Sequence, residues 1–224
     1  MKKDTIDFIN KHNLQFFGAV NASISHELKN ILAIISETAG FLDDLTQLSK
    51  QGKKFELSML ENCSNSIVEE IERGFDTIRQ MNKFAHSVDD SIKTISIADT
   101  LALTVKLSSF LSYAKKVRLD ENSADDITIT TSPFLLQNLI YKTLRALYRA
   151  MDAKDELTIE YSGKEFSYIT LDFSSKSLLD LKNFPDEKIN NVADALKTEF
   201  IITDTGLKLN IQRTNDTLTA ALTD

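Results

Sequence analysis

Hydrophobic side chains recur every three or four positions over two long stretches in the N-terminal part of the chain. The first stretch extends from about residue 11 to residue 49 without a proline, and its apolar positions are Phe17, Val20, Ile24, Leu28, Ile31, Ile35, Leu42 and Leu45. The second has the same spacing at Met59, Cys63, Ile67, Ile71, Phe75, Ile78, Met81 and Phe84. This periodicity predicts two long amphipathic helices. Because only the polar residues 50–54 separate them, we expect an antiparallel helical hairpin.

One hairpin of this length cannot bury two complete apolar faces by itself. Pairing with a second copy would cover both faces, so we expect a homodimer whose four helices form a bundle. Cys63 lies on the apolar stripe of the second helix and is predicted to be a small core residue.

The spacing of apolar residues changes after the polar segment 87–90, and we place a domain boundary there. Residues 1–90 form the predicted helical hairpin domain, and residues 91–224 form a predicted α/β domain, which makes the fold class α+β. Helices are expected at 98–114, 133–151 and 185–199, the second with Ser132 as its N-cap and Pro133 in its first turn. Strands are expected at 117–119, 127–130, 157–161, 168–173, 200–203, 207–211 and 218–221.

Composition narrows the class of protein. The 224 residues are 42% hydrophobic and 26% charged, with a net charge of −7 and no basic block, which argues against nucleic acid as a partner. No segment approaches the roughly 18 consecutive apolar residues that span a bilayer, so membrane insertion is not expected. Asp4 and Asp7 stand where a secretory signal would be apolar, and a single cysteine excludes an intramolecular disulfide. We therefore expect a cytoplasmic protein.

The segment Ser25-His26-Glu27-Leu28-Lys29-Asn30 carries the candidate chemistry. At about 100° per residue, His26 lies roughly 200° from Ile24 and from Leu28, so its imidazole should face solvent. Glu27 is the adjacent carboxylate that could bias the tautomer of the ring, and Asn30 lies one turn further along the same face. An exposed neutral imidazole, a carboxylate and an amide are the groups that a phosphoryl transfer requires.

These six residues, followed by Ile31-Leu32-Ala33-Ile34-Ile35, resemble the dimerisation and phosphotransfer hairpin (HisKA-type) of sensor histidine kinases. The segment 81–87 is similar to the exit of such hairpins. The resemblance implies that His26 is the phosphoacceptor, that Glu27 is its acid–base partner, and that Asn30 acts in dephosphorylating a partner. Family members usually have a proline after the asparagine, where this chain has Ile31, so their helix kink is not implied.

In a complete kinase, the second domain would bind ATP, and here the resemblance is one of element order only. The helix at 133–151 is similar to the one that donates asparagines to magnesium, but those positions hold Tyr141 or Lys142, and Arg145 or Ala146. Residues 172–176 stand in place of an Asp-x-Gly-x-Gly element without its glycines, and residues 205–209 keep only a remnant of a later glycine-rich box.

Only two glycines, Gly163 and Gly206, lie beyond residue 92, too few for a phosphate-cradling lid. We expect no cofactor in this chain and no productive ATP binding; magnesium would be held by a partner. Lys142, Arg145 and Arg149 form a basic strip on the predicted helix, for which a solvated face is the favoured interpretation over contact with an acidic partner.

The resemblance as a whole is to small histidine phosphotransferases of the ChpT type with a degenerate ATPase-like domain. It implies transfer of phosphoryl groups between aspartates of response-regulator receiver domains in a two-component phosphorelay. The expected docking residues are Lys29, Ala33, Glu37, Arg73, Asp76 and Arg79. The alternatives are a divergent active kinase, a non-catalytic adaptor that binds a receiver, and a phosphatase acting through Glu27 and Asn30. His12 and His86 are interpreted as ordinary surface or helix-end residues.

Overall fold

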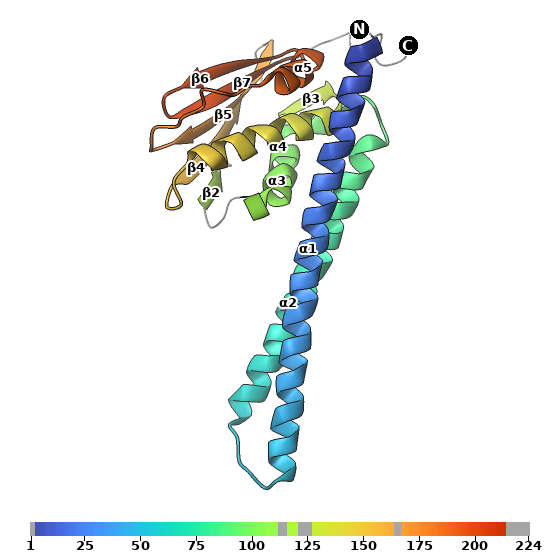
Figure 1. Cartoon of the computed structure of the whole chain (residues 1–224), viewed down its shortest axis with the longest axis vertical. Helices are drawn as coiled ribbons and strands as arrows, with labels where there is room; N and C mark the ends of the chain where they lie inside the picture. Colours follow the sequence, from blue (N-terminus) through green and yellow to red (C-terminus); the bar gives the residue numbers. More distant parts are fainter. Residues whose placement is uncertain (1–2, 112–115, 121–126, 164–166, 214–224) are drawn as a thin grey trace. The chain divides into compact units, whose positions relative to one another are not determined.

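Two units make up the chain in the computed structural model, which describes residues 3–111, 116–120, 127–163 and 167–213 (Figure 1). One unit comprises residues 21–83 and is called the hairpin unit below. The other comprises residues 1–20 together with 84–224 and is called the sheet unit. This division differs from the boundary expected near residue 90, because residues up to 20 and from 84 onward group with the sheet rather than with the hairpin.

The hairpin consists of the two predicted helices, α1 (Lys3–Lys50) and α2 (Leu57–Ala85). The first helix begins about eight residues earlier than its apolar periodicity suggested. It ends at Lys50. Just beyond this end, Gly52 has a φ of 74°, a left-handed conformation that favours glycine, and the amide of Lys53 donates to the carbonyl of Leu48 at 3.1 Å. The predicted interruption at 50–54 is therefore confirmed as the helix end.

The apolar stripes of the hairpin unit are only partly covered in a single chain. Ile24, Ile31, Leu45 and Cys63 are buried, which confirms Cys63 as a core residue. Gly74 is buried where the two helices meet, and a Cβ there would be in ordinary van der Waals contact with Cγ2 of Ile31, at 3.7 Å. Nine large hydrophobic residues of this unit remain exposed: Leu32, Ile34, Phe41, Leu57, Met59, Val68, Ile71, Phe75 and Ile78.

The sheet unit contains a five-stranded mixed sheet with the strand order β2-β4-β5-β7-β6. Its strands are β2 (Lys116–Leu119), β4 (Glu156–Ser162), β5 (Tyr168–Ser175), β6 (Thr198–Thr203) and β7 (Gly206–Gln212). The β2–β4 pair is parallel and the others are antiparallel. A two-stranded antiparallel sheet pairs β1 (Lys93–Ser96) with β3 (Thr128–Thr131).

Three helices, α3 (Ile97–Leu107), α4 (Pro133–Ala150) and α5 (Glu187–Ala195), cover one face of the large sheet (Figure 1). Short 3-10 turns lie at His86–Val88 and Ser109–Leu111. In β4, β5 and β7, buried residues alternate with more exposed ones. The buried strand residues of the covered face are Leu157, Ile159, Ile169, Leu171, Phe173, Leu207, Leu209 and Ile211, all at most 1% exposed. A helical hairpin followed by this α/β layer confirms the predicted fold class.

An aromatic cluster explains why the start of α1 belongs to the sheet unit. Phe16 contacts Phe84 edge-on at 5.4 Å between ring centroids, Phe134 at 5.3 Å and Tyr141 at 5.0 Å, and Phe17 stacks on Phe84 at 5.4 Å. These rings come from the start of α1, the end of α2 and α4. Aromatic pairs of this kind add stability beyond the area that they bury.

The predicted elements differ from the structure at several places. The helix expected at 98–114 ends as α3 at Leu107 and is followed by the 3-10 turn Ser109–Leu111. Residues 196–199, predicted as helix, leave α5 through Lys197, which has a φ of 49°, and enter β6 at Thr198. Strand β1 was not predicted, and Ser132 occupies the N-cap position of α4 without a capping hydrogen bond from its side chain. The strand predicted at 218–221 lies outside the described residues. Helix α5 is capped by Asp186, whose Oδ1 accepts from the amide of Ile189 at 2.8 Å.

Candidate functional site

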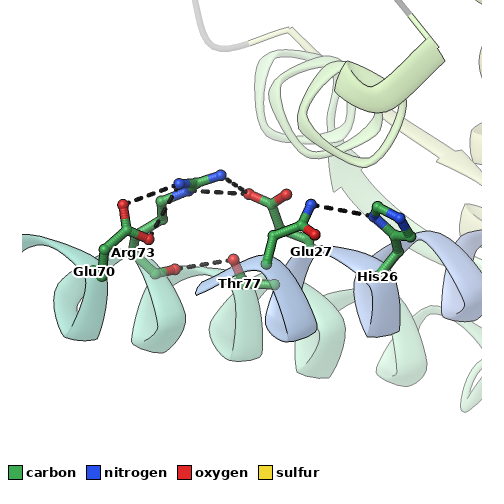
Figure 2. A network of polar contacts seen from close by, with 6 residues as sticks. His26, Glu27, Glu70, Arg73 and Thr77 are labelled. Atoms are coloured by element: carbon green, nitrogen blue, oxygen red, sulfur yellow. Dashed lines mark hydrogen bonds and ion pairs between the residues drawn. The ribbon is translucent and has the colours of Figure 1, made fainter. Parts of the chain in front are cut away.

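His26 lies in the interior of α1 and its imidazole is exposed to solvent, as the helical periodicity predicted. Asn30 is one turn further along, and its side-chain amide contacts Nδ1 of the ring at 3.2 Å (Figure 2). The contact joins residues i and i+4, which are neighbours on one face of a helix. It engages one of the two ring nitrogens and leaves Nε2 without a contact from Asn30.

Glu27 is turned toward α2 rather than toward the imidazole (Figure 2). Its Oε1 accepts from Nε of Arg73 at 3.0 Å and from Nη2 of Arg73 at 2.5 Å. Arg73, one of the expected docking residues, therefore lies on α2 level with Glu27. The side chain that contacts the imidazole is therefore Asn30, whereas the sequence had suggested Glu27 as the group beside the ring.

Arg73 bridges two carboxylates, because its Nη1 also donates to both carboxylate oxygens of Glu70 at 3.1 Å (Figure 2). The hydrogen bond that Arg73 donates to Glu27 is the main cause that raises the pKa of Arg73 further above its ordinary value. Thr77 donates to the backbone carbonyl of Arg73 at 2.9 Å. A guanidinium that stays charged and is held at both sides ties the two helices together beside His26.

The remaining sequence-predicted site residues are all on the surface of the hairpin unit. Lys29, Ala33 and Glu37 are exposed on α1. Asp76 and Arg79 are exposed on α2 and form an ion pair with each other. Each is therefore accessible to a partner.

The other two histidines have different surroundings. His86 is exposed just after α2, where Nδ1 contacts the carboxylate of Asp89 at 2.7 Å, so its interpretation as a helix-end residue is confirmed. His12 is buried, 8% exposed, and Nδ1 contacts Oε1 of Gln15 at 2.9 Å. The interpretation of His12 as a surface residue was wrong, because the start of α1 packs within the sheet unit.

The two glycines beyond residue 92, Gly163 and Gly206, lie where neighbouring strands pass close to each other. A Cβ on Gly206 would lie 2.0 Å from the backbone oxygen of Phe173, and one on Gly163 would lie 2.5 Å from that of Tyr168. Gly163 also has a φ of 117°. Both allow close passage of neighbouring strands, which is a different task from cradling a phosphate.

The positions that the resemblance assigned to nucleotide binding have other contacts. Asp172 points to the sheet face opposite the core and forms an ion pair with Lys208 at 2.6 Å, which raises the pKa of that lysine. On α4, Tyr141 is buried in the aromatic cluster, and Lys142 and Arg145 offer cationic nitrogen in place of an oxygen ligand. Within the described residues, no group of three or more His, Cys, Asp or Glu side chains could hold a metal ion.

Sequence reasoning missed the partner of Arg73 on its own helix. Glu70 stands three residues before Arg73, a spacing that places both side chains on one helix face and that could have suggested the pair. The Glu27–Arg73 bond had no such signal, because it depends on how α1 and α2 align.

Comparisons with known proteins give a similar arrangement of elements at low identity. No family model matches the chain, and no curated protein matches it. Among solved structures, the histidine kinase AdeS of Acinetobacter baumannii is 10% identical with a TM-score of 0.47, over 85% of this chain and 98% of that one. A bacterial phosphotransferase is 10% identical with a TM-score of 0.48, over 89% and 96%. The histidine kinase domain of a blue-light activated kinase from Erythrobacter litoralis is 12% identical with a TM-score of 0.43, over 91% and 94%.

A likeness of this strength identifies neither an activity nor a partner, so the function has to be inferred from the residues. Over the described part of the chain, none of the helices has the length and hydrophobicity needed to cross a membrane.

Proposed function

We propose that the chain is a histidine phosphotransferase that passes phosphoryl groups between receiver-domain aspartates through His26. The observation that supports this most directly is the exposed imidazole, held at Nδ1 by Asn30 on a continuous helix. A nucleophile that waits at the surface of a rigid element suits a reaction whose second reactant is another protein.

The amide of Asn30 can serve both tautomers of the ring. When its nitrogen faces the ring, Nδ1 accepts and Nε2 carries the proton; when its oxygen faces the ring, Nδ1 donates and the Nε2 lone pair is free. In the second state, Nε2 attacks the phosphorus of an aspartyl phosphate, the P–O bond breaks, and the aspartate leaves as a carboxylate. The proton stays on Nδ1, and the reverse step delivers the phosphoryl group to a second aspartate.

Receiver docking would use the exposed side chains around His26. These are Lys29, Ala33 and Glu37 on α1, and Arg73, Asp76 and Arg79 on α2. The docked receiver would supply the magnesium, and Glu27 would act as the acid–base partner once its bond with Arg73 opens. The bond is more than a third exposed at both side chains, so its opening needs little free energy.

The exposed hydrophobic residues of the hairpin unit favour a homodimer as the working form. Nine large apolar side chains on two helices exceed what a monomeric surface usually leaves in contact with water. A second hairpin packed against them would complete a four-helix bundle. We further propose that the chain does not use ATP, because the α4 positions expected to hold magnesium carry Lys142 and Arg145 and the two glycines serve strand packing.

The test is phosphoryl transfer from a radiolabelled, phosphorylated receiver domain to the purified chain, followed as acid-labile protein phosphate. We expect labelling of the wild type, its complete loss in His26→Ala, and wild-type labelling in His86→Ala, since His86 is an equally exposed histidine away from the site. Labelling of His26→Ala at the wild-type rate would overturn the proposal.

Parallel reactions separate the other functions. Labelling from ATP and magnesium alone would identify a divergent kinase and refute the proposal. Binding of a receiver without any transfer would identify an adaptor. Loss of receiver phosphate that survives His26→Ala but not Asn30→Ala would identify a phosphatase.

A further inference from the structure

The guanidinium of Arg73 lies between two carboxylates that differ in their exposure to solvent. Glu27 reaches it from α1, and Glu70 reaches it from α2, where it stands three residues before Arg73 (Figure 2). The side chain of Glu27 is 38% exposed and that of Glu70 is 15% exposed. Because solvent and salt weaken an exposed ion pair more than a covered one, the Glu27 contact is the one that opens more easily.

The hydrogen bonds between Arg73 and Glu27 also converge on a single oxygen. Nε and Nη2 of Arg73 both donate to Oε1, while Oε2 accepts no hydrogen bond within the described part of the chain. The strongest arginine–carboxylate pairs use both carboxylate oxygens side by side. The contact therefore directs Glu27 toward α2 without the strength of a two-oxygen pair.

A second carboxylate on the same guanidinium is more than a link between the helices requires. Glu70 and Arg73 both belong to α2, so the bond between them joins no helices, and it competes with Glu27 for one positive charge. The same bond keeps the guanidinium in place on α2 when Glu27 leaves. Glu27 can thus be released while Arg73 keeps an acidic partner.

The direction in which Glu27 points matters because it follows His26 in the chain. Neighbouring residues of a helix lie about 100° apart around its axis, and the staggered rotamers of Glu27 swing its carboxylate to different sides of its own Cα. In the structure this carboxylate lies on the α2 side, and Asn30 is the residue that contacts the imidazole.

We propose that Arg73 is a positioning residue that restrains Glu27, and that the Glu27–Arg73 contact must open before Glu27 can act on the imidazole of His26. The inference rests on the proposed function, which assigns Glu27 the role of acid–base partner. Arg73 draws Glu27 away from the ring, Glu70 weakens this pull by sharing the guanidinium, and the balance between the two carboxylates sets how often Glu27 is available.

Single-turnover transfer from a saturating concentration of phosphorylated receiver domain tests this, because the rate constant then reports on the step after docking. Arg73→Gln frees Glu27 and should raise the rate constant about two- to fivefold, the range expected for one exposed ion pair. Glu70→Gln leaves the whole charge of Arg73 to Glu27 and should lower the rate constant. Arg73→Lys keeps a positive charge at this position and should restore a rate close to that of the wild type.

A residue that only ties the helices together predicts a different pattern. In that case Arg73→Gln and Glu70→Gln both loosen the hairpin and change the rate in the same direction. Glu27→Gln should slow the transfer, and adding Arg73→Gln to it should have no further effect, since no carboxylate is left to restrain. Arg118→Gln is the control, because its ion pair with Asp120 lies in the sheet unit, and it should leave the rate unchanged.

The restraint can also be measured without a receiver, from the reaction of His26 with diethyl pyrocarbonate. Only the neutral imidazole attacks this reagent, and a carboxylate close to the ring favours the charged form. Glu27→Gln should therefore leave the reaction rate unchanged when Arg73 is present. In the Arg73→Gln background it should raise the rate by about threefold at pH 7, the order expected when a neighbouring opposite charge is removed. Mass spectrometry of the peptide that contains His26 measures the extent of reaction.

Two results would overturn the inference. One is a change of the transfer rate in the same direction for Arg73→Gln and Glu70→Gln, and the other is an equal effect of Glu27→Gln on the diethyl pyrocarbonate reaction with and without Arg73. If no receiver labels the chain, the proposed function fails, and the reaction with diethyl pyrocarbonate still decides whether Arg73 restrains Glu27.

Discussion

The two units leave opposite kinds of groups without partners. In the hairpin unit, nine large hydrophobic side chains are exposed, while its chemistry-bearing residues sit in hydrogen bonds at the surface. In the sheet unit the apolar core is covered, but α4 buries polar atoms that have no hydrogen-bond partner among the described residues: Gln137 Oε1, Asn138 Oδ1, Lys142 Nζ and Thr143 Oγ1. Exposed apolar side chains of the hairpin unit thus lack apolar neighbours. In the sheet unit, by contrast, buried polar atoms of α4 lack hydrogen-bond partners among the described residues.

Each unit has its own natural probe, so this comparison can be tested without labels. The chain has no tryptophan, and its five tyrosines all lie beyond residue 92, so tyrosine fluorescence reports on the sheet unit. The only cysteine, Cys63, is 6% exposed inside the hairpin unit, so its reaction with a thiol reagent reports on the opening of that unit.

The largest difference should come from truncating leucines. Leu144 is fully buried in the core beneath α4, and Leu144→Ala should lower the free energy of unfolding by about 3–5 kcal/mol through lost burial and a cavity. Leu32 is 64% exposed on α1, and Leu32→Ala should change it by less than about 0.5 kcal/mol. Urea unfolding followed by tyrosine fluorescence measures the effect of Leu144→Ala, and urea unfolding followed by Cys63 reactivity measures the effect of Leu32→Ala. Equal losses would refute the contrast between a covered and an uncovered core.

Breaking the proposed dimer should have the next largest effect. Phe75 is 59% exposed on α2, and placing a carboxylate on that face in both copies should weaken self-association by at least about 100-fold. Sedimentation equilibrium of Phe75→Glu gives the dissociation constant. The matched control is Ile202→Glu, because Ile202 lies on β6 and is 45% exposed. This variant should leave the dissociation constant of the dimer unchanged. Identical masses for wild type and Phe75→Glu would rule out this face as the interface.

The parts of the fold that follow from local pattern were predictable. Steps of three and four located α1 and α2, and alternation located β4, β5 and β7, because burial of one face leaves a period in the sequence. The exposure of His26 followed from the same periodicity. The segment 196–199 was misassigned because a left-handed Lys197 ends α5 without a glycine or proline to signal it.

What could not be predicted depends on alignment between distant segments. The Glu27–Arg73 bond spans 46 positions, and no period relates them. The burial of His12 requires the start of α1 to lie against α4, a contact made by aromatic rings spread from residue 16 to residue 141.

A smaller effect on stability is expected from removal of the Glu27–Arg73 ion pair, which joins α1 and α2 beside His26. Glu27→Gln removes the charge from an exposed ion pair, so it should lower hairpin stability by roughly 0.3–1 kcal/mol, and less in high salt. Cys63 reactivity in urea measures the change. Glu37→Gln, an exposed glutamate on the same helix, should have no effect. A loss in Glu27→Gln that is unaltered by salt would mean that the bond contributes through packing instead.

The smallest expected effect is on how the free energy of unfolding of the sheet unit changes with pH. Burial lowers the pKa of His12 below 6.5, and Lys142, Lys188 and Lys11 act in the same direction, while the hydrogen bond with Gln15 opposes them. In the window just below pH 6.5, the unfolded chain therefore binds more protons at this position than the folded chain, so stability rises with pH. Urea unfolding by tyrosine fluorescence at pH 7.5 and 5.5 should show a larger acid-induced loss for the wild type than for His12→Gln. Equal acid-induced losses of stability in the wild type and in His12→Gln would mean that His12 titrates alike in the folded and unfolded chains. Its burial would then not disfavour the charged imidazolium.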